Sequence, residues 1–506
     1  MRKILCASVM AGLLGISALA SASPLVTPNV PLDSEYYTYL DKMEAMGYIE
    51  DMATNARPYS RLQVATWLAE LNPAGMPLYL RVHYNEMVED LAEEIAYVQQ
   101  GDNTASFGNT LGLKNMETSF TYVDADHTSY AYKGQRVNAS WQPLNKNNNG
   151  YRYGDGANFV GKLNISGNLN EDWALSLTPR FSYDDDQHGD ASLEEGYVKS
   201  HLGVWGIEAG KMPLQWGGRQ SSLAYSNNAT PHTMVKLNLL EPYEIEHGFF
   251  RFLGKANVNV FYSQMEGNRR AKAEDFSSLW QREDDHAHLI GVRMDFVPQD
   301  YFTFGLERIS MLRGFDSDWI TGDNAYENDK WDDIAGFDFR LRFPGVQLYG
   351  ELYGEDQAGY FPSDNAYTAG VYFPQLTADG SWDLRLEGSK TKSGWYGHGR
   401  FVNGWVYKDA IMGNAMGGDA LQYTAAINHY LDNGDRLGLS YCNTDFARSH
   451  KHNMGMREYT INYSTKLEKN MYLDAMVGYA KLENVDHKKD HEDDTTMVGL
   501  GLRWDF

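Results

Sequence analysis

The chain has 506 residues, among them 34 Tyr, 21 Phe, 12 Trp and 48 Gly. This abundance of strand-forming and turn-forming residues favours an architecture of many short β-strands. The formal net charge of -24 argues against a nucleic-acid partner, because binding to phosphates requires a basic surface.

Residues 1–22 predict a cleaved signal peptide. Arg2 and Lys3 precede an apolar run that is too short to span a bilayer, and Ala20-Ser21-Ala22 supplies the small residues of a cleavage site. Cleavage would also remove Cys6, so Cys442 would be the only thiol of the mature chain and no internal disulfide is expected.

Residues 23–104 predict a small N-terminal helical domain. Apolar residues recur at helical spacing over residues 36–46, and a second helix is expected to begin at Ser60, which forms a capping pattern with Gln63. A third and longest helix is expected to run as one piece up to Gly101. Its apolar stripe consists of Leu80, Tyr84, Met87, Leu91, Ile95 and Val98.

Residues 105–506 change to a period of two and predict a closed, all-β transmembrane barrel. Short turns such as Pro344-Gly345, opposed to acidic connections such as 184–186 and 316–333, are typical of outer-membrane barrels. About nineteen candidate strands can be counted, and even numbers are preferred, so about 18 antiparallel strands are expected. In the last strand one face would meet lipid through Thr496, Val498, Leu500, Leu502, Trp504 and Phe506.

The opposite face of these strands carries charges that would point into the barrel. With lipid outside and charges inside, the apolar core of a soluble sandwich is not required. The charges could form ion pairs that hold a plug, or they could line a pore. The residues expected to act in this way are Asp338, Arg340, Arg342, Glu351, Asp383 and Arg385.

Three stretches in the barrel region resemble a known family. Residues 210–231 contain Lys211-Met212-Pro213-Leu214-Gln215-Trp216-Gly217-Gly218 and the later run Ser226-Asn227-Asn228-Ala229-Thr230-Pro231. Residues 336–356 and 386–419 follow in the same order as in the Wzi family of capsule assembly proteins, which this chain therefore resembles. Where that family usually has Trp-Gly-Pro-Gly, this chain has Trp216-Gly217-Gly218-Arg219.

The resemblance implies an outer-membrane lectin in a diderm bacterium. Its helical domain would lie on the periplasmic side, and the barrel would hold exported capsular polysaccharide at the cell surface. It implies no enzymatic activity and no cofactor. The expected partners are capsular or surface polysaccharide, outer-membrane lipid and the barrel assembly machinery.

Sugar binding requires flat aromatic faces for pyranose C–H groups together with polar groups for hydroxyls. An alternative interpretation places the same aromatic residues in the membrane-interface girdle, or, for the turn at residue 216, in packing inside the lumen. The candidates for contact with polysaccharide are Trp216, Asn227, Asn228, Trp395, Tyr396, His398, Trp405 and Tyr407.

Other motifs give weaker evidence of a functional site. Residues 487–494 and 184–195 contain metal-ligating residue types, but solvated surface loops explain both, so no metal is predicted. No Gly-x-Ser-x-Gly motif and no phosphate loop is found, so no catalytic residue is assigned.

Two alternative functions remain at this point. One is a wall-tethered porin, because residues 39–68 faintly resemble an S-layer homology repeat. The other is an outer-membrane hydrolase, for which carboxylates are plentiful but no spacing identifies a pair.

Overall fold

The computed structural model describes residues 25–50, 52, 55–100, 107–185, 188–218, 222–267, 286–314, 331–355, 357–358, 361–362, 364–399 and 401–506. The predicted signal peptide lies outside these residues. No helix of the described chain is long and apolar enough to cross a membrane.

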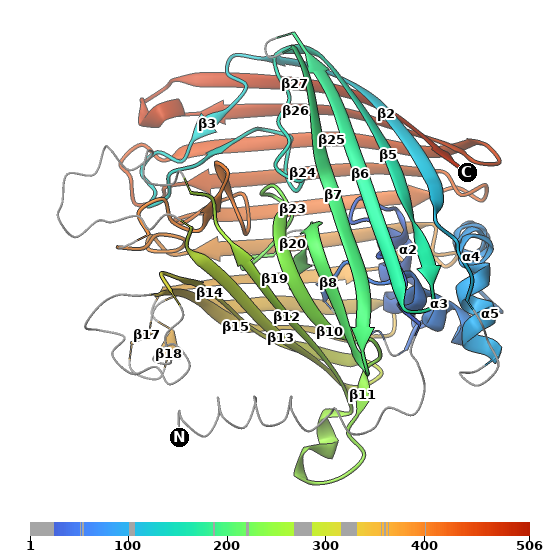
Figure 1. Cartoon of the computed structure of the whole chain (residues 1–506). Coiled ribbons are helices and arrows are strands. Elements are labelled where there is room, and N and C mark those ends of the chain that lie inside the picture. Colours follow the sequence, from blue (N-terminus) through green and yellow to red (C-terminus); the bar gives the residue numbers. More distant parts are fainter. Residues whose placement is uncertain are drawn as a thin grey trace.

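In the described residues, eighteen antiparallel strand positions form a closed barrel, as the alternating pattern predicted (Figure 1). β2 pairs with β27 from Asn115↔Asp505 to Ala125↔Thr495 and so closes the ring. β10 and β11 both pair with β12 and together occupy one strand position. The strands are β2 (Gly112–Ala125), β5 (Gly156–Asn170), β6 (Trp173–Asp184), β7 (His188–Leu202), β8 (Trp205–Met212), β10 (His232–Leu239), β11 (Tyr243–Glu244), β12 (Lys255–Gln264), β13 (His288–Gln299), β14 (Phe302–Leu312), β15 (Trp331–Phe343), β16 (Val346–Gly354), β19 (Asn365–Phe373), β20 (Trp382–Thr391), β23 (Leu421–Tyr430), β24 (Arg436–Phe446), β25 (Met454–Glu468), β26 (Met471–Glu483) and β27 (Glu492–Asp505).

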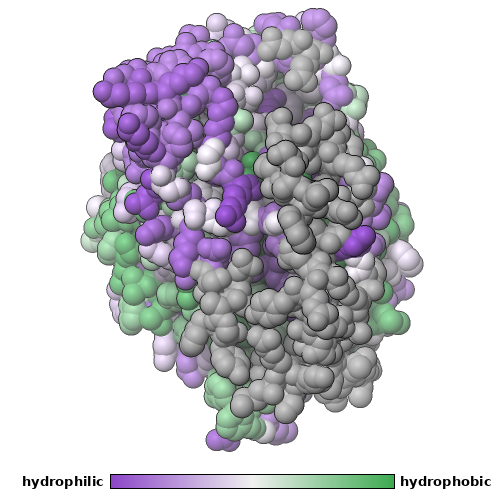
Figure 2. Space-filling model, turned by 90° about the vertical axis from the view of Figure 1, so that its left-hand side faces the viewer, coloured by the Kyte–Doolittle hydropathy of each residue, from purple (hydrophilic) through white to green (hydrophobic). Residues whose placement is uncertain are grey.

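The outer wall is apolar, as the sequence of the last strand predicted. Leu500, Leu502 and Trp504 of β27 are 50%, 43% and 46% exposed, although all three are large and hydrophobic. Figure 2, which looks at the end with the long connections, shows hydrophobic side chains along the flanks of the molecule. Such a belt around a closed sheet is the surface that meets acyl chains in a transmembrane barrel.

The first two predicted helices are confirmed. α2 (Tyr36–Met46) ends at Gly47, which adopts the left-handed conformation with φ 85°. α3 (Arg61–Glu70) begins after Ser60, whose hydroxyl accepts a hydrogen bond from the amide of Gln63 at 3.1 Å.

The prediction of one long third helix was wrong. The chain forms α4 (Leu78–Asp90) and α5 (Ala92–Gln100), which are separated by Leu91 with φ -100° and ψ 20°. The guanidinium of Arg61 donates to the carbonyl oxygen of Asp90 at 2.7 Å. This hydrogen bond gives the carbonyl oxygen of Asp90 a partner other than the amide of Glu94, which would continue the helix. The break between α4 and α5 lets α5 pack against α3. The apolar stripe has the same spacing in both cases, so it could not reveal the break.

Both ends of the barrel are filled. The helices lie at the end with the short turns (Figure 1). From there the chain enters the lumen, where β1 (Ala56–Arg57) pairs with β9 (Gln215–Trp216), a segment of the long connection that follows β8. The N-terminal segment, which fills the barrel from the helical end, and the loop after β8, which fills it from the other end, therefore meet inside the barrel.

Three long connections, residues 126–155, 213–231 and 392–420, contribute to an apolar cluster inside the barrel. The alternation along the strands predicted the charged inner face but not this apolar cluster, which forms because loops fold back into the lumen. The connection after β6 is also shorter than expected, with only residues 185–187 between β6 and β7.

Small hairpins shape the inserted loops: β3 (Tyr130–Ala131) with β4 (Ser140–Trp141), and β21 (Val406–Tyr407) with β22 (Ala410–Ile411). β17 (Gln357–Ala358) pairs with β18 (Phe361–Pro362) in another connection.

Candidate functional site

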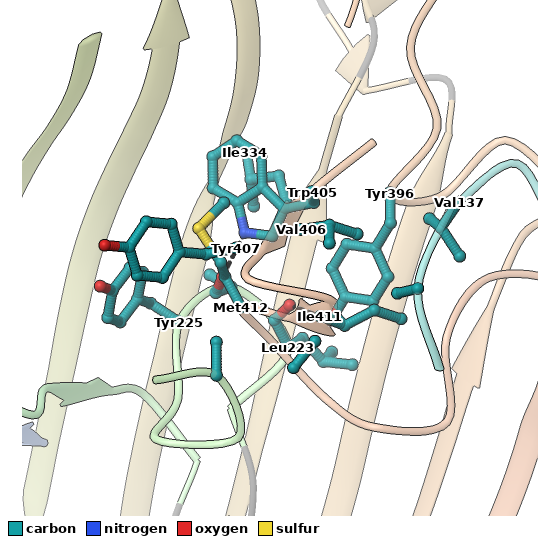
Figure 3. Close-up of a cluster of buried hydrophobic side chains, with 14 of the residues drawn as sticks. Val137, Leu223, Tyr225, Ile334, Tyr396, Trp405, Val406, Tyr407, Ile411 and Met412 are labelled. Atoms are coloured by element: carbon teal, nitrogen blue, oxygen red, sulfur yellow. Dashed lines mark hydrogen bonds between the residues drawn. The ribbon is translucent and has the colours of Figure 1, made fainter. Parts of the chain in front are cut away.

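The aromatic residues singled out in the sequence lie in the inserted loops, and they are buried. Trp216, Trp395 and Trp405 have no exposed surface. The indole nitrogen of Trp405 donates to the carbonyl oxygen of Ala224 at 2.9 Å, which joins the connection after β20 to the connection after β8. Figure 3 shows Trp405 among side chains from both connections and from the barrel wall.

Tyr396 links the same two connections through its hydroxyl. The hydroxyl donates to the carbonyl oxygen of Leu223 and accepts from the amide of Asn414 at 2.8 Å. Its own amide donates to the carboxylate of Glu355 at 2.6 Å. Burial raises the pKa of Tyr396, so the phenol stays neutral and keeps its proton for the bond to Leu223.

Tyr407 and the two asparagines complete the contacts between loops. The ring of Tyr407 stacks on His232 with 3.7 Å between centroids, and burial raises the pKa of Tyr407 to about 12. The side-chain amide of Asn227 donates to the carbonyl oxygen of residue 147, and that of Asn228 donates to the carbonyl oxygen of residue 411, each at 2.9 Å. The two asparagines bind three long connections to one another, and Tyr407 joins one of these connections to β10.

His398 and Asn228 have intermediate exposure, whereas the other six candidates are buried. The Nδ1 atom of His398 accepts a hydrogen bond from the amide of Phe401 at 3.4 Å. The structure therefore brings the eight residues together, but it covers the faces of the aromatic rings with protein. Direct contact of these rings with sugar stays a prediction, and their visible role is to hold the loops in the lumen.

The predicted lumenal charges face inward, and several of them hold the N-terminal segment. Arg342 donates to the carbonyl oxygens of Glu44 and Ile49 at 2.7 and 3.0 Å, at the C-terminal end of α2, where the helix dipole favours a cation. Arg340 donates to the carbonyl oxygen of Met52 at 2.7 Å. Asp383 pairs with Lys42 of α2 at 3.3 Å.

The other predicted lumenal residues act within the wall or on the loops. The carboxylate of Glu351 accepts from the amides of Gly218 and Leu223, so it holds the loop that contains Trp216. The guanidinium of Arg385 lies 4.6 Å from the centroid of the Tyr372 ring.

Asp338 belongs to a buried network around Arg293 that the sequence did not single out. The guanidinium of Arg293 contacts Glu307 and Asp338 at 2.7 Å and Asp295 at 2.6 Å. The only signal in the sequence was the inward alternation of charges along β13, and alternation does not reveal partners on other strands.

A polar cavity of about 180 Å³ lies against the wall where the first and last strands meet. It is lined by strand residues such as Glu117 and Arg503 and by Asp33 and Tyr151 of the segments inside the lumen. Because the inserted loops and the N-terminal segment occupy the lumen, we place the candidate binding surface at the outer ends of the long connections.

The tips of three connections, residues 126–155, 447–453 and 484–491, meet through His487. Its two ring nitrogens lie 2.8 Å from the carbonyl oxygens of Lys133 and His452, which belong to two other connections. Lys133 also pairs with Asp486 at 2.6 Å, and its hydrogen bond lowers the pKa of that carboxyl group. Sequence reasoning treated residues 487–494 only as metal-ligand types, and no group of three or more such ligands was found among the described residues.

Two of the connections that meet at this junction also carry exposed cationic side chains. We call Arg136, Arg448 and Lys451 the rim cations. They lie at the end of the barrel opposite the helices, on loops whose bases are fixed by the buried cluster. A surface of this kind presents hydrogen-bond donors on a rigid frame.

Comparison with known proteins gives the family. The model of the family described as "Capsule assembly protein Wzi" matches residues 125–497, which is most of the barrel. The chain belongs to the Wzi family. A Klebsiella pneumoniae relative, described as an uncharacterized 55.8 kDa protein in the cps region, is 24% identical over 309 residues, and the match covers 55% of this chain and 59% of the relative's length.

Among solved structures, the chain is similar to Escherichia coli Wzi, described as an outer-membrane protein involved in group 1 capsule assembly and a carbohydrate-binding β-barrel. The TM-score is 0.68 at 17% identity, and the match covers 96% of this chain and 99% of the other. At this identity the likeness shows that the two chains share the fold, from the N-terminal helices to the last strand.

Proposed function

We propose that this Wzi family protein binds capsular or surface polysaccharide at the outer ends of its long connections and so attaches the polymer to the cell. The observation that carries the proposal is a barrel filled from both ends, whose inserted loops form a fixed platform and not a passage. The described carbohydrate binding of the E. coli protein supports the same role here.

In this proposal the barrel lies in the outer membrane, and the helices α2–α5 face the periplasm. The predicted signal peptide and the short turns at the helical end support this orientation. The barrel assembly machinery would insert the protein, and lipid would surround the apolar belt. No catalytic step is part of the proposed role.

A clean deletion tests the cellular function. Capsule should appear in the medium while the total amount of polysaccharide stays unchanged, because attachment and not synthesis is lost. Cells that keep a normal amount of bound polymer after the deletion would contradict the proposal.

The binding surface is tested with purified protein and the native capsule, compared with unrelated polysaccharides. Replacement of the rim cations by serine (R136S/R448S/K451S) should weaken binding several-fold. Lys469, which is 81% exposed in the turn between β25 and β26 at the opposite end, provides the matched control as K469S. Equal binding by both variants would exclude the rim as the site.

A wall-tethered porin and an outer-membrane hydrolase give different results in two further measurements. A porin would conduct strongly in a planar bilayer, whereas the filled lumen should pass little current. A hydrolase would shorten the bound polymer, which size-exclusion chromatography of the polysaccharide would detect.

A further inference from the structure

One connection at the helical end differs from its neighbours. Residues 240–254 link β10 to β12, whereas only two residues separate the strands in hairpins such as β13–β14 and β15–β16. The connection contains β11 and a short 3-10 turn, η2 (Phe249–Leu253), and it projects beyond the ends of the adjacent strands (Figure 1).

The turn presents three aromatic side chains to the surroundings. Phe249, Phe250 and Phe252 are 82%, 59% and 58% exposed, and no residue of the turn is buried. The Phe249 ring contacts the rings of Phe250 and Phe252 with 5.3 and 6.0 Å between centroids. Three adjacent exposed phenylalanines form an apolar patch whose contact with water is unfavourable. Such patches mark surfaces that contact a partner or a membrane.

The patch continues the lipid-facing belt. On β10 the outward residues Val235 and Leu237 are 46% and 38% exposed, as expected of side chains that meet lipid. Nearer the connection, Ala256 and Phe296 also point outward, because they pair with one another in the same alternation, but both are only 9% exposed. η2 packs against β13, so the base of the connection rests on the outer wall.

Polar residues flank the aromatic patch in an order that suits a membrane interface. Glu246 and His247, before the turn, are 66% and 93% exposed. Arg251 is exposed between Phe250 and Phe252. A guanidinium can donate paired hydrogen bonds to a phosphate while the neighbouring aromatic rings enter the acyl region.

We propose that Phe249, Phe250 and Phe252 insert into the leaflet that surrounds the helical end of the barrel, with Arg251 at the phosphates, so that the connection is an aromatic anchor for phospholipid. The proposal commits to phospholipid because the patch is continuous with the belt that the bilayer already covers. It is independent of polysaccharide binding, since it lies at the opposite end of the molecule.

Spin labels measure where this turn lies. In a C442S background, a nitroxide is attached at F250C, and the mature protein is reconstituted into vesicles of phosphatidylethanolamine and phosphatidylglycerol with a neutral nickel chelate on both sides. L237C on the outer wall is the control for lipid. L78C is the control for water, because Leu78 is 47% exposed on α4.

The label at F250C should collide with oxygen more often than with the nickel chelate, as at L237C, and the ratio should exceed that at L78C several-fold. A ratio equal to that at L78C would place the turn in water and overturn the proposal. Low accessibility to both reagents would indicate a protein partner or a second copy, and would overturn it as well. F252C repeats the measurement if the label at F250C disturbs folding.

Discussion

Lys42 makes the deepest contact between the N-terminal helices and the barrel wall. The side chains of Lys42 and Asp383 are 0% and 1% exposed. The ammonium donates to the carbonyl oxygen of Pro374 at 2.7 Å and lies 4.2 Å from the centroid of the Tyr430 ring. Lys42→Met leaves the Asp383 carboxylate buried without its cation, and we expect the free energy of unfolding to fall by about 3–5 kcal/mol.

The effect should depend on pH in a defined direction. Burial, only partly offset by Asp383, lowers the pKa of Lys42 to about 8. The pKa of an unfolded lysine is about 10.4, so between these values the unfolded chain holds a proton that the folded chain lacks, and raising the pH favours the fold. The wild type carries the cost of burying the ammonium below pH 8 and loses it by about pH 10.4, whereas K42M has no such cost, so the loss of stability in K42M should be larger at pH 10.4 than at pH 8.

Guanidinium unfolding of the purified protein in detergent micelles, followed by circular dichroism, measures both effects. The matched control is K466M, because Lys466 and Glu86 also join the barrel to the helices but are 31% and 20% exposed, so their loss should cost only about 0.2–1 kcal/mol. The double variant K42M/D383N should recover part of the stability lost in K42M. The reasoning fails if K42M costs no more than K466M, or if the difference in stability between wild type and K42M stays constant from pH 8 to 10.4.

Two further changes test the interior. Trp405→Ala should lower the free energy of unfolding by about 3–5 kcal/mol and raise single-channel conductance, because it removes the indole between two inserted loops; Trp405→Phe should do less, and conductance unchanged by Trp405→Ala would argue against its role in closing the lumen. Arg293→Leu should cost at least about 3–5 kcal/mol, seen as a lower temperature for the mobility shift in electrophoresis, because three buried carboxylates lose their shared cation. Arg308→Leu is its control, since the pair with Asp333 is 33% and 19% exposed; an equal shift in both variants would contradict this account.

Local patterns in the sequence were sufficient to predict the barrel and the first two helices. Leu500, Leu502 and Trp504 alternate with inward residues whatever their partners are, so the lipid-facing side could be recognised without the register. Ser60 and Gly47 carry their capping signals within a few residues. The break at Leu91 had no local signal, because its visible cause is Arg61, thirty residues earlier, which binds a carbonyl of α4.

The candidate site was recognised by residue type but not by role. Tryptophan and tyrosine in Gly-rich loops suit both a sugar platform and a buried core, and the choice depends on whether the loops fold outward or inward. Trp405 is buried because Ala224, from a connection about 180 residues away, offers its carbonyl oxygen in the lumen. No pattern within either loop contains that contact.

The sequence by itself determined the class of wall, its apolar outer face and the charges of its inner face, because each depends on a period of two along single strands. The tertiary structure decided what the inner charges bind and that the lumen is filled. These outcomes depend on contacts between distant segments, such as Lys42 with Asp383 and Ala56 with Trp216, which form only after the barrel has brought both ends of the chain into one space.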